Sequence, residues 1–295
     1  MKKVLIIGSK NIGTKNDPIK IAEDMNLSDL EATVIYWEDI IFDIATGVVN
    51  IYANNKDIID NKPDLVIALG WYKNGNKSIY RDVAFSLALF LQHNGIKFWN
   101  SEMGSQRSTT KLSCMVQLSL ENIPIPRTYF SLNIKNSTNL PLPFVAKAAG
   151  ASRGKFNYLI KTDNDLSKIY DTDVYYLIQP YLPNDHDLRV ICFNGFPNLI
   201  LKRARRQDSE THLNNTSQGG IATWLELSDI KPELLTLSNK ICKVTGREMA
   251  GIDFIPDISS SFGYSCLEVN AIPQLTSGTD SNKKLTALID VLINI

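Results

Sequence analysis

The sequence has little of what marks a zinc-binding, secreted or nucleic-acid-binding protein. Its 295 residues contain four cysteines and three histidines, all widely separated and without a Cys-x-x-Cys pair, which argues against a zinc site. Lys plus Arg (31) equal Asp plus Glu (31), so no overall positive charge attracts nucleic acid or an acidic membrane. No apolar run approaches the length of a membrane span. We therefore expect a cytoplasmic protein with neither nucleic acid nor membrane as a partner.

The first residues, MKKVLIIGSKNIG, have four apolar positions before Gly8. That is too short for the apolar region of a signal peptide and predicts a first strand. The stretch IIGSKNIG lacks the G-x-G-x-x-G spacing, so an ordinary strand-to-helix turn is favoured over the alternative of a dinucleotide-binding oxidoreductase.

Short apolar runs alternate with amphipathic stretches in the first hundred residues. This alternation predicts a parallel sheet in an α/β domain over residues 1–100. The expected strands are 3–7, 32–37, 64–69 and 96–99, and the expected helices are 17–26 and 78–93.

The remainder of the chain is richer in strands. We expect helices at 108–122, 231–245 and 281–294, and strands at 143–147, 156–161, 174–181, 188–193 and 197–202. Residues 204–220 are polar and nearly free of apolar side chains, which predicts a mobile loop.

Two segments near the end of the chain carry acids among apolar residues. In GYSCLEVNAIP, regular pleating would point Glu268 and Asn270 to one face and Leu267 and Val269 to the other. Asp253 lies in AGIDFIPD, and pairing of the two strands would bring three oxygen ligands together. Such a set suits magnesium, although a solvent-exposed face of an edge strand is the alternative.

A second group of polar residues has the types needed to hold phosphate. Lys147 ends the strand PFVAK and precedes AAGASRG, whose Gly150, Ser152 and Gly154 could present backbone N–H groups, although a hairpin turn alone would explain that loop.

Further along, Asp187 and Arg189 share a strand face, and Arg203 lies in the basic run LKRARR. A surface ion pair and a solvated strand end are the simpler interpretations of these two features.

In its order, this series resembles the ATP-grasp superfamily, nearest its RimK-type carboxylate–amine ligases, whose members include ribosomal-protein glutamylating and peptide-modifying enzymes. The resemblance covers about residues 99–278. It implies an α/β fold in which a Rossmann-like pre-ATP-grasp domain (1–100) precedes a two-lobed α+β ATP-grasp fold with a central lobe (101–175) and a C-terminal lobe (176–295).

The resemblance also assigns roles to residues. Arg189 and Arg203 are implied to be catalytic, on the γ-phosphate and acyl phosphate, and the residues 179–182 to form the hinge that binds adenine. The implied magnesium ligands are Asp253, Glu268 and Asn270. The implied nucleotide-binding residues are Lys111, Lys147, Gly150, Ser152, Gly154, Gln179, Pro180, Tyr181, Leu182, Asp187 and Asn215.

The implied reaction uses ATP with magnesium, expected as two ions and replaceable by manganese. A carboxylate would be phosphorylated to an acyl phosphate, which an amine then attacks to give an amide, with release of ADP and phosphate. The expected partners are a carboxylate substrate and an amine-bearing amino acid, peptide or protein, and a homo-oligomer is kept open. Closure of 204–220 would keep water from the intermediate.

Two alternatives stay open at this point. One is a macrocyclase that forms ester or lactam links in a ribosomally made peptide, and the other is a catalytically silent nucleotide-binding or carrier module. Two positions also depart from the family pattern, since Phe156 and Gln274 stand where glycine is common. They affect the phosphate-binding loop and the turn beside the acceptor site, respectively.

Overall fold

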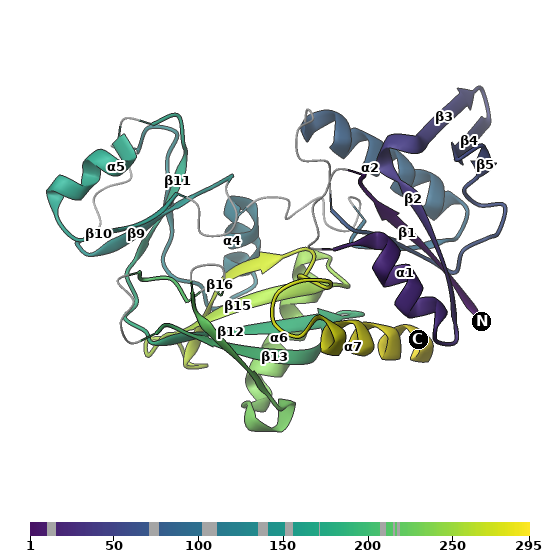
Figure 1. Cartoon of the computed structure of the whole chain (residues 1–295). Helices are drawn as coiled ribbons and strands as arrows, with labels where there is room; N and C mark the ends of the chain where they lie inside the picture. The colour runs from purple at the N-terminus through teal and green to yellow at the C-terminus, as the bar shows by residue number, and fades with distance from the viewer. Residues whose placement is uncertain are drawn as a thin grey trace. The chain divides into compact units, whose positions relative to one another are not determined.

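The computed structural model describes residues 1–10, 16–70, 77–101, 111–134, 141–150, 156–170, 172–206, 211–214, 216 and 219–295. The chain forms two compact units (Figure 1). One unit contains Met1–Gln106, Gly246–Met249 and Ala271–Ile295, and the other contains Arg107–Thr245 and Ala250–Asn270. The three-part division expected from the family stays a prediction.

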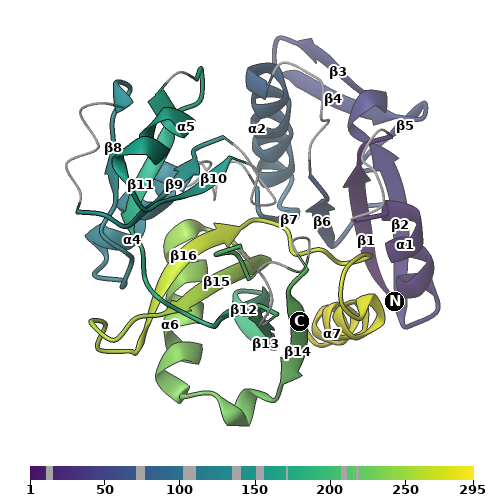
Figure 2. The same cartoon turned by 60° about the vertical axis from the view of Figure 1, so that its left-hand side comes forward.

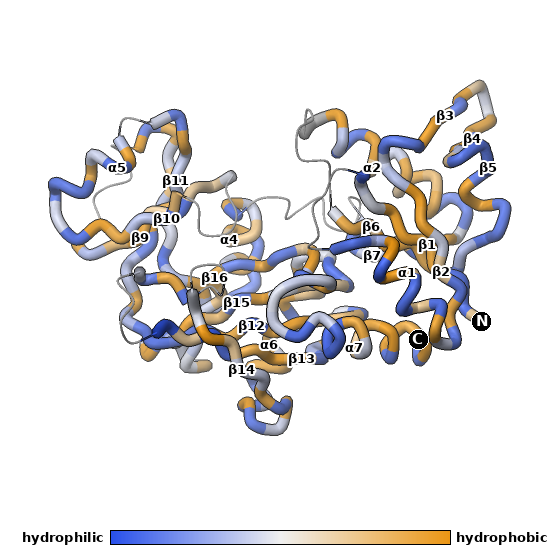
Figure 3. Tube along the Cα trace, in the orientation of Figure 1, coloured by the Kyte–Doolittle hydropathy of each residue, from blue (hydrophilic) through white to orange (hydrophobic). Residues whose placement is uncertain are grey.

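The first unit is built on a parallel sheet, as the alternating pattern predicted. Its strand order is β2-β1-β6-β7, with β1 at Lys2–Gly8, β2 at Leu30–Tyr36, β6 at Leu65–Ala68 and β7 at Lys97–Trp99. Figure 3 shows β1 as a predominantly hydrophobic strand, in keeping with its position inside the sheet. The helices α1 (Pro18–Asn26) and α2 (Lys77–His93) connect these strands. Asp17 caps α1 by accepting from the backbone N–H of Ile19 at 3.0 Å.

A second, antiparallel sheet in this unit was not predicted. It consists of β3 (Ile40–Ala45), β4 (Val48–Ala53) and β5 (Lys56–Asp57), after a short 3-10 turn, Trp37–Asp39. Gly47, with φ +77°, forms part of the turn between β3 and β4. The expectation of strictly alternating strands and helices left no room for a hairpin.

The first unit is completed by segments from the end of the chain. Helix α7 (Ser281–Asn294) has the predicted bounds and packs against α1. The Asn100 side chain donates to the carbonyl of Met249 at 2.7 Å and accepts from the N–H of the same residue at 2.9 Å. It also donates to the carbonyl of Ala271. One amide group therefore ties together the places where the chain leaves and re-enters this unit.

The second unit contains two antiparallel sheets (Figure 2). One has the order β10-β9-β11-β8, and its strands are β8 (Tyr129–Phe130), β9 (Phe144–Ala148), β10 (Asn157–Ile160) and β11 (Tyr176–Pro180). The other has the order β14-β13-β12-β15-β16, and its strands are β12 (His186–Phe193), β13 (Phe196–Ala204), β14 (Ile221–Leu225), β15 (Ala250–Pro256) and β16 (Tyr264–Asn270). Strand β14, which follows the polar stretch 204–220, was not predicted.

Helices cover the larger of these sheets. Helix α6 (Pro232–Thr245) packs on β12 and β13, and α4 (Lys111–Leu120) packs on α6 and β16, so that apolar residues of all these elements form one core. Residues 108–110 of the predicted helix lie outside the described residues. Shorter helical segments are Asp163–Leu166, α5 (Ser167–Tyr170) and Leu227–Asp229. Within the described ranges, no helix combines the length and apolar character needed to cross a membrane.

Phe156 lies at the start of the β10 arm of the β9–β10 hairpin, where the family commonly has glycine. Its φ is +52°, in the left-handed region that favours glycine, and its side chain is half exposed. Its carbonyl accepts from the N–H of Ala148 at 3.1 Å, so the conformation is held by the hairpin. Phe156 therefore adopts the left-handed conformation that glycine adopts without strain, and the phenylalanine pays for it in backbone strain.

We expect the Phe156→Gly variant to be more stable than Phe156→Ala by about 1 kcal/mol, because only glycine adopts this conformation without strain. The comparison isolates the backbone, since both variants lose the ring. Urea denaturation of the two variants measures the difference. Equal stability, or a more stable alanine variant, would show that the backbone is unstrained at this position.

Candidate active site

The candidate site begins with charged side chains on one face of the five-stranded sheet. The strand register places Arg189 of β12 opposite Asp253 of β15, and Asp253 opposite Glu268 of β16. The same register places Asp187 of β12 opposite Arg203 of β13. Two acids facing each other across neighbouring strands repel, so Asp253 and Glu268 need nearby cations. Arg189 of β12 and Arg203 of β13 provide two such cations.

Four of these residues form a continuous ion-pair network. Arg189 binds Asp253 with two hydrogen bonds, Nε to Oδ1 and Nη2 to Oδ2, each 2.7 Å long. Arg203 donates from Nε to Asp187 Oδ1 at 2.6 Å, and its Nη2 lies 3.2 Å from Asp253 Oδ2. The side chains of Arg203 and Asp187 are 5% and 6% exposed. Asp187 was expected to bind the nucleotide, and that role stays a prediction. Its carboxylate accepts the hydrogen bond from Arg203.

The network keeps its charges because each buried ion has a partner. Burial alone would raise the pKa of Asp253, but the guanidinium groups of Arg189 and Arg203 outweigh this effect and hold that pKa below its usual value. Burial and the neighbouring Asp253 raise the pKa of Asp187 despite Arg203. Burial opposes the charge of Arg203, but the two carboxylates raise its pKa.

Two lysines lie beside this network. Lys147 is on β9, and Lys111 begins the described part of α4 and donates to the carbonyl of Ala148 at 3.2 Å. The ammonium of Lys111 also lies 3.7 Å from a carboxylate oxygen of Glu268. Burial, with the charge of Lys111, lowers the pKa of Lys147 to about 8, although Glu268 and Asp253 counteract this. Two cations that raise the cost of each other's charge are suited to bind an anion.

The predicted hinge, Gln179–Leu182, begins with the last two residues of β11, which belongs to the same sheet as Lys147. Gln179 is buried, and its Nε2 donates to Thr128 Oγ1 at 2.9 Å. Its Oε1 is also buried and has no hydrogen-bond partner in the described part of the chain. The N–H of Tyr181 donates to the carbonyl of Pro143 at 3.2 Å, which fixes the start of the hinge. A buried acceptor without a donor suits a ligand that supplies an N–H group.

The end of β16 departs from the regular pleat that the sequence suggested. The pairing shifts between Asp253 and Phe254, which leaves Leu267 as an extra residue in β16. Glu268 and Asn270 still lie two residues apart after the bulge, opposite Asp253 and Gly251. The expectation that they share a face with Asp253 therefore agrees with the register, whereas the expected regular strand is wrong.

The oxygen atoms at this strand end fit magnesium only if phosphate completes the coordination. Asp253 already accepts two hydrogen bonds from Arg189 and forms an ion pair with Arg203, while Glu268, with its side chain 34% exposed, is paired with Lys111 at 3.7 Å. In the described ranges, no three His, Cys, Asp or Glu residues are grouped so that they could hold a metal ion. Magnesium commonly takes one or two carboxylates and then phosphate oxygens and water, which matches this donor set.

Some predicted positions cannot be placed at the site. Ser152, Gly154 and Asn215 lie outside the described residues. Gly150 is exposed at the turn after β9, where a Cβ would meet nothing within 4 Å. The mobility expected for 204–220 stays a prediction.

Gln274 belongs to the first unit. Its Oε1 lies 3.1 Å from where a Cβ would stand on Gly278, whose φ is +78°. The long polar side chain therefore packs against a backbone position that favours glycine.

A residue that the sequence analysis did not single out, His212, lies near Lys147. The charge of Lys147 is one of the causes that lower the pKa of His212, after burial, and the imidazole contacts β10 through Asn157. Its sequence signal was weak, because one histidine in a long polar stretch is usually a solvated residue.

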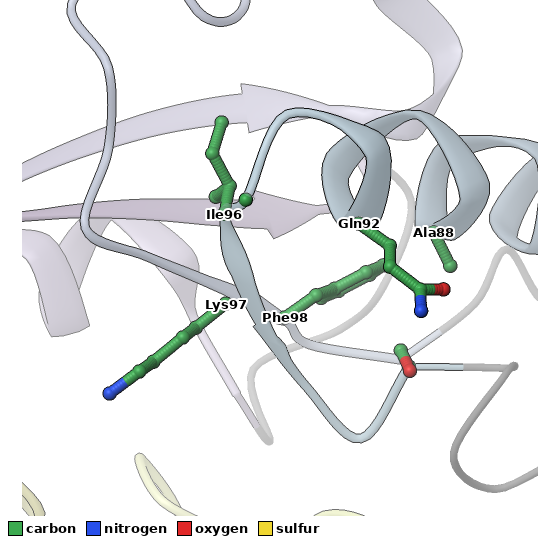
Figure 4. Close-up of a pocket in the computed structure, with 7 residues that line it drawn as sticks. Ala88, Gln92, Ile96, Lys97 and Phe98 are labelled. Carbon is green, nitrogen blue, oxygen red and sulfur yellow. The ribbon is translucent and has the colours of Figure 1, made fainter.

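The first unit contains a separate pocket of about 480 Å³ (Figure 4). Ala88 and Gln92 project from α2 near Phe98 of β7, and one charged side chain, Lys97, is among the lining residues. The complete lining is Ala88, Gln92, Gly95, Ile96, Lys97, Phe98 and Ser101. None of these residues was predicted to act in catalysis, and the pocket lacks the paired charges found on the five-stranded sheet.

Known proteins similar to this chain are ligases and synthases. The zebrafish beta-citrylglutamate synthase B is 22% identical over 246 residues, which are 79% of this chain and 58% of that protein. The human N-acetylaspartylglutamate synthase A is 24% identical over 255 residues, or 82% of this chain and 62% of that protein. The chain thus spans about three fifths of the length of these relatives. A probable alpha-L-glutamate ligase of Trichodesmium erythraeum is 25% identical over 211 residues, covering 66% of this chain and 68% of that protein.

Solved structures share the fold over the whole chain. The ATP-grasp ligase PsnB, complexed with a phosphomimetic variant of a minimal precursor, Mg and ADP, gives a TM-score of 0.71 at 16% identity, over 100% of this chain and 98% of that one. The D-alanine–D-alanine ligase of Bacillus anthracis, complexed with ATP, gives 0.65 at 15% identity, over 100% and 97% of the two chains. The model of the RimK-like ATP-grasp domain matches residues 108–292. The protein belongs to the RimK-like ATP-grasp family.

Proposed function

We propose that this protein is an ATP-dependent carboxylate–amine ligase that forms an amide through an acyl phosphate and releases ADP and phosphate. The observation that carries the proposal is the convergence of Lys111 and Lys147 with Glu268 beside the buried Arg189–Asp253 pair. Two lysines next to a partly exposed carboxylate suit the transfer of a phosphoryl group from a metal-bound nucleotide. Membership of a family with ligase and synthase relatives supports the same reaction class.

The nucleotide would be held at both of its ends by the second unit. Lys147 and Lys111 would bind the phosphates, since their ammonium groups lie together and face the charge of Glu268. The segment Gln179–Leu182 would bind the base, and the buried Oε1 of Gln179 would accept from an amino group such as that of adenine. Lys147 and Gln179 belong to one sheet, because β11 pairs directly with β9.

Glu268 and Asn270, with the remaining lone pair of Asp253, would hold magnesium. When bound, magnesium neutralises phosphate charge and orients the transferring group. Two hydrogen bonds from Arg189 and the ion pair with Arg203 fix the Asp253 carboxylate, so the direction of its free oxygen lone pair does not depend on the metal. In this arrangement both arginines position an acid, and contact with the transferring phosphoryl group remains part of the proposal.

The names of the relatives guide the choice of substrates to test. Glutamate is the first amine to test, because several relatives are described as probable alpha-L-glutamate ligases. Acids to test include N-acylated amino acids, citrate and the C-terminal and side-chain carboxylates of peptides. Release of ADP with each acid, with and without glutamate, separates activation of the acid from coupling. A protein that binds MgATP but releases no ADP with any of these acids would support a nucleotide-binding or carrier module instead.

A chemical test of the lysine assignment does not need the substrate. With a pKa of about 8, Lys147 is about half deprotonated at pH 8, whereas an ordinary lysine is below about 1% deprotonated. We expect a limiting amount of an amine-acylating reagent at pH 8 to modify Lys147 at least about tenfold faster than the exposed Lys231, as measured by mass spectrometry of peptides.

Addition of MgATP should then slow the modification of Lys147 and leave that of Lys231 unchanged. Protection of neither lysine, in a protein shown by calorimetry to bind MgATP, would remove Lys147 from the phosphate site. Modification of both lysines at the same rate would contradict the lowered pKa.

The role of Glu268 is tested by turnover. Glu268→Gln keeps the size of the side chain but removes its charge, so we expect a loss of roughly a hundredfold or more in ADP release and in hydroxamate formation with hydroxylamine. Glu233→Gln, on the first turn of α6, changes a charge outside the site and is the matched control. Unchanged melting of both variants would show that the fold is intact. Near-normal turnover in Glu268→Gln would exclude this carboxylate from the reaction.

A further inference from the structure

His212 lies in a short described segment, residues 211–214, that is held to the second unit at two points. Its Nε2 is 3.1 Å from Oδ1 of Asn157, at the start of β10. Two residues later, the buried Asn214 donates from Nδ2 to Oδ1 of Asn184, just after the hinge, at 2.8 Å. The segment therefore bridges the β9–β10 hairpin and the hinge, which are the two places assigned to the phosphates and the base.

The contact with Asn157 places the imidazole beside the phosphate-binding lysine. Asn157 is paired with Lys147 across the β9–β10 hairpin. Because the amide oxygen of Asn157 accepts, Nε2 carries the proton in this contact and Nδ1 is the nitrogen that can take up another proton. His212 is thus fixed through one nitrogen while its second nitrogen determines its charge.

The charged groups that act on His212 are all cations. Burial, followed by Lys147 of β9, Arg205 after β13 and Lys161 after β10, lowers the pKa of His212 to about 4. No carboxylate of the described residues contributes to this shift. Three cations from three different elements around a partly buried imidazole leave an excess of positive charge, which favours an anionic ligand.

We propose that His212 is a further polyphosphate-binding residue of this site, and that it takes up a proton when the nucleotide binds. The proposal rests on the proposed function, because it takes Lys147 as the residue that binds phosphate. The family resemblance assigned no role to His212, and only the contact with Asn157 shows its position.

The sign of the pH dependence follows from the surroundings. Without ligand, burial and the three cations keep His212 neutral above about pH 4. Polyphosphate neutralises these cations and adds an acceptor for an imidazolium N–H, so the pKa of His212 rises on binding. The bound state then carries the extra proton between about pH 4 and its raised pKa, and nucleotide affinity increases as pH falls through that raised pKa. If binding restores the pKa of His212 to about 6.5, nucleotide affinity would increase about fourfold between pH 7.5 and pH 6.0.

The experiment measures the proton directly. NMR titration of the His212 ring in the full chain gives its pKa without ligand and with saturating MgADP. Calorimetry of MgADP binding at pH 6.0, in two buffers of different ionisation enthalpy, gives the number of protons taken up. His212→Gln keeps an N–H donor for Asn157 but cannot titrate, and His93→Gln removes an exposed histidine of the first unit as the matched control.

We expect the pKa of His212 to rise from about 4 to 6.5 or above when MgADP binds. The His212→Gln variant should take up fewer protons on binding, by roughly half a proton or more, and should lose the fourfold gain in affinity at low pH. The His93→Gln control should keep both the proton uptake and the gain in affinity. An unchanged pKa of His212 in a protein that binds MgADP would overturn the proposal and leave the proposed function intact. Equal proton uptake in wild type and His212→Gln would overturn it in the same way. Absence of MgADP binding by the wild type would overturn the proposed function itself, and this inference with it.

Discussion

The burial of three charges in the five-stranded sheet, Asp187, Arg203 and Asp253, together with the partly buried Arg189, is the constraint on which the site depends. Asp187, Arg203, Asp253 and Arg189 alternate in sign, and removal of any one would leave an uncompensated charge in a region with little solvent. The Asp187–Arg203 and Arg189–Asp253 pairs are each formed between β12 and a neighbouring strand, so a slip of one residue in β12 would separate both pairs and move Asp187 and Arg189 to the other face. The network therefore specifies the strand register as well as the local charge.

The same constraint determines what Glu268 can do. The charge of Asp253 is neutralised by two guanidinium groups, so the charges at this strand end that can still interact with a ligand are those of Glu268 and the two lysines. A partly exposed acid beside two cations, at 3.7 Å from one of them, gives a surface that is more easily rearranged than the 2.6–2.7 Å pairs of the network. The fixed ion pairs of the network position the strand end, while the side chains of Glu268 and the two lysines can adjust to a ligand.

Much of the fold could be predicted from local patterns, because apolar runs and helix signals are encoded within a few residues. The bounds of α7 agree with the prediction, and the parallel strands of the first unit differ by one or two residues. The hairpin over 40–53 was missed because the alternating strand–helix pattern was extended over it. The strand face shared by Glu268 and Asn270 followed from periodicity, but the bulge at Leu267 and the contact of His212 with Asn157 depend on residues distant in the sequence.

The path of the chain through the two units has a consequence for how the protein is made. The first unit needs Gly246–Met249 and Ala271–Ile295, which are synthesised after nearly all of the second unit. The hydrogen bonds of Asn100 to Met249 and Ala271 therefore form only after those residues have emerged from the ribosome. The packing of α7 on α1 forms later still. The second unit, by contrast, has its sequence available earlier. Synthesis from the N-terminus thus reverses the usual order, and the segment that is translated first is the last to be completed.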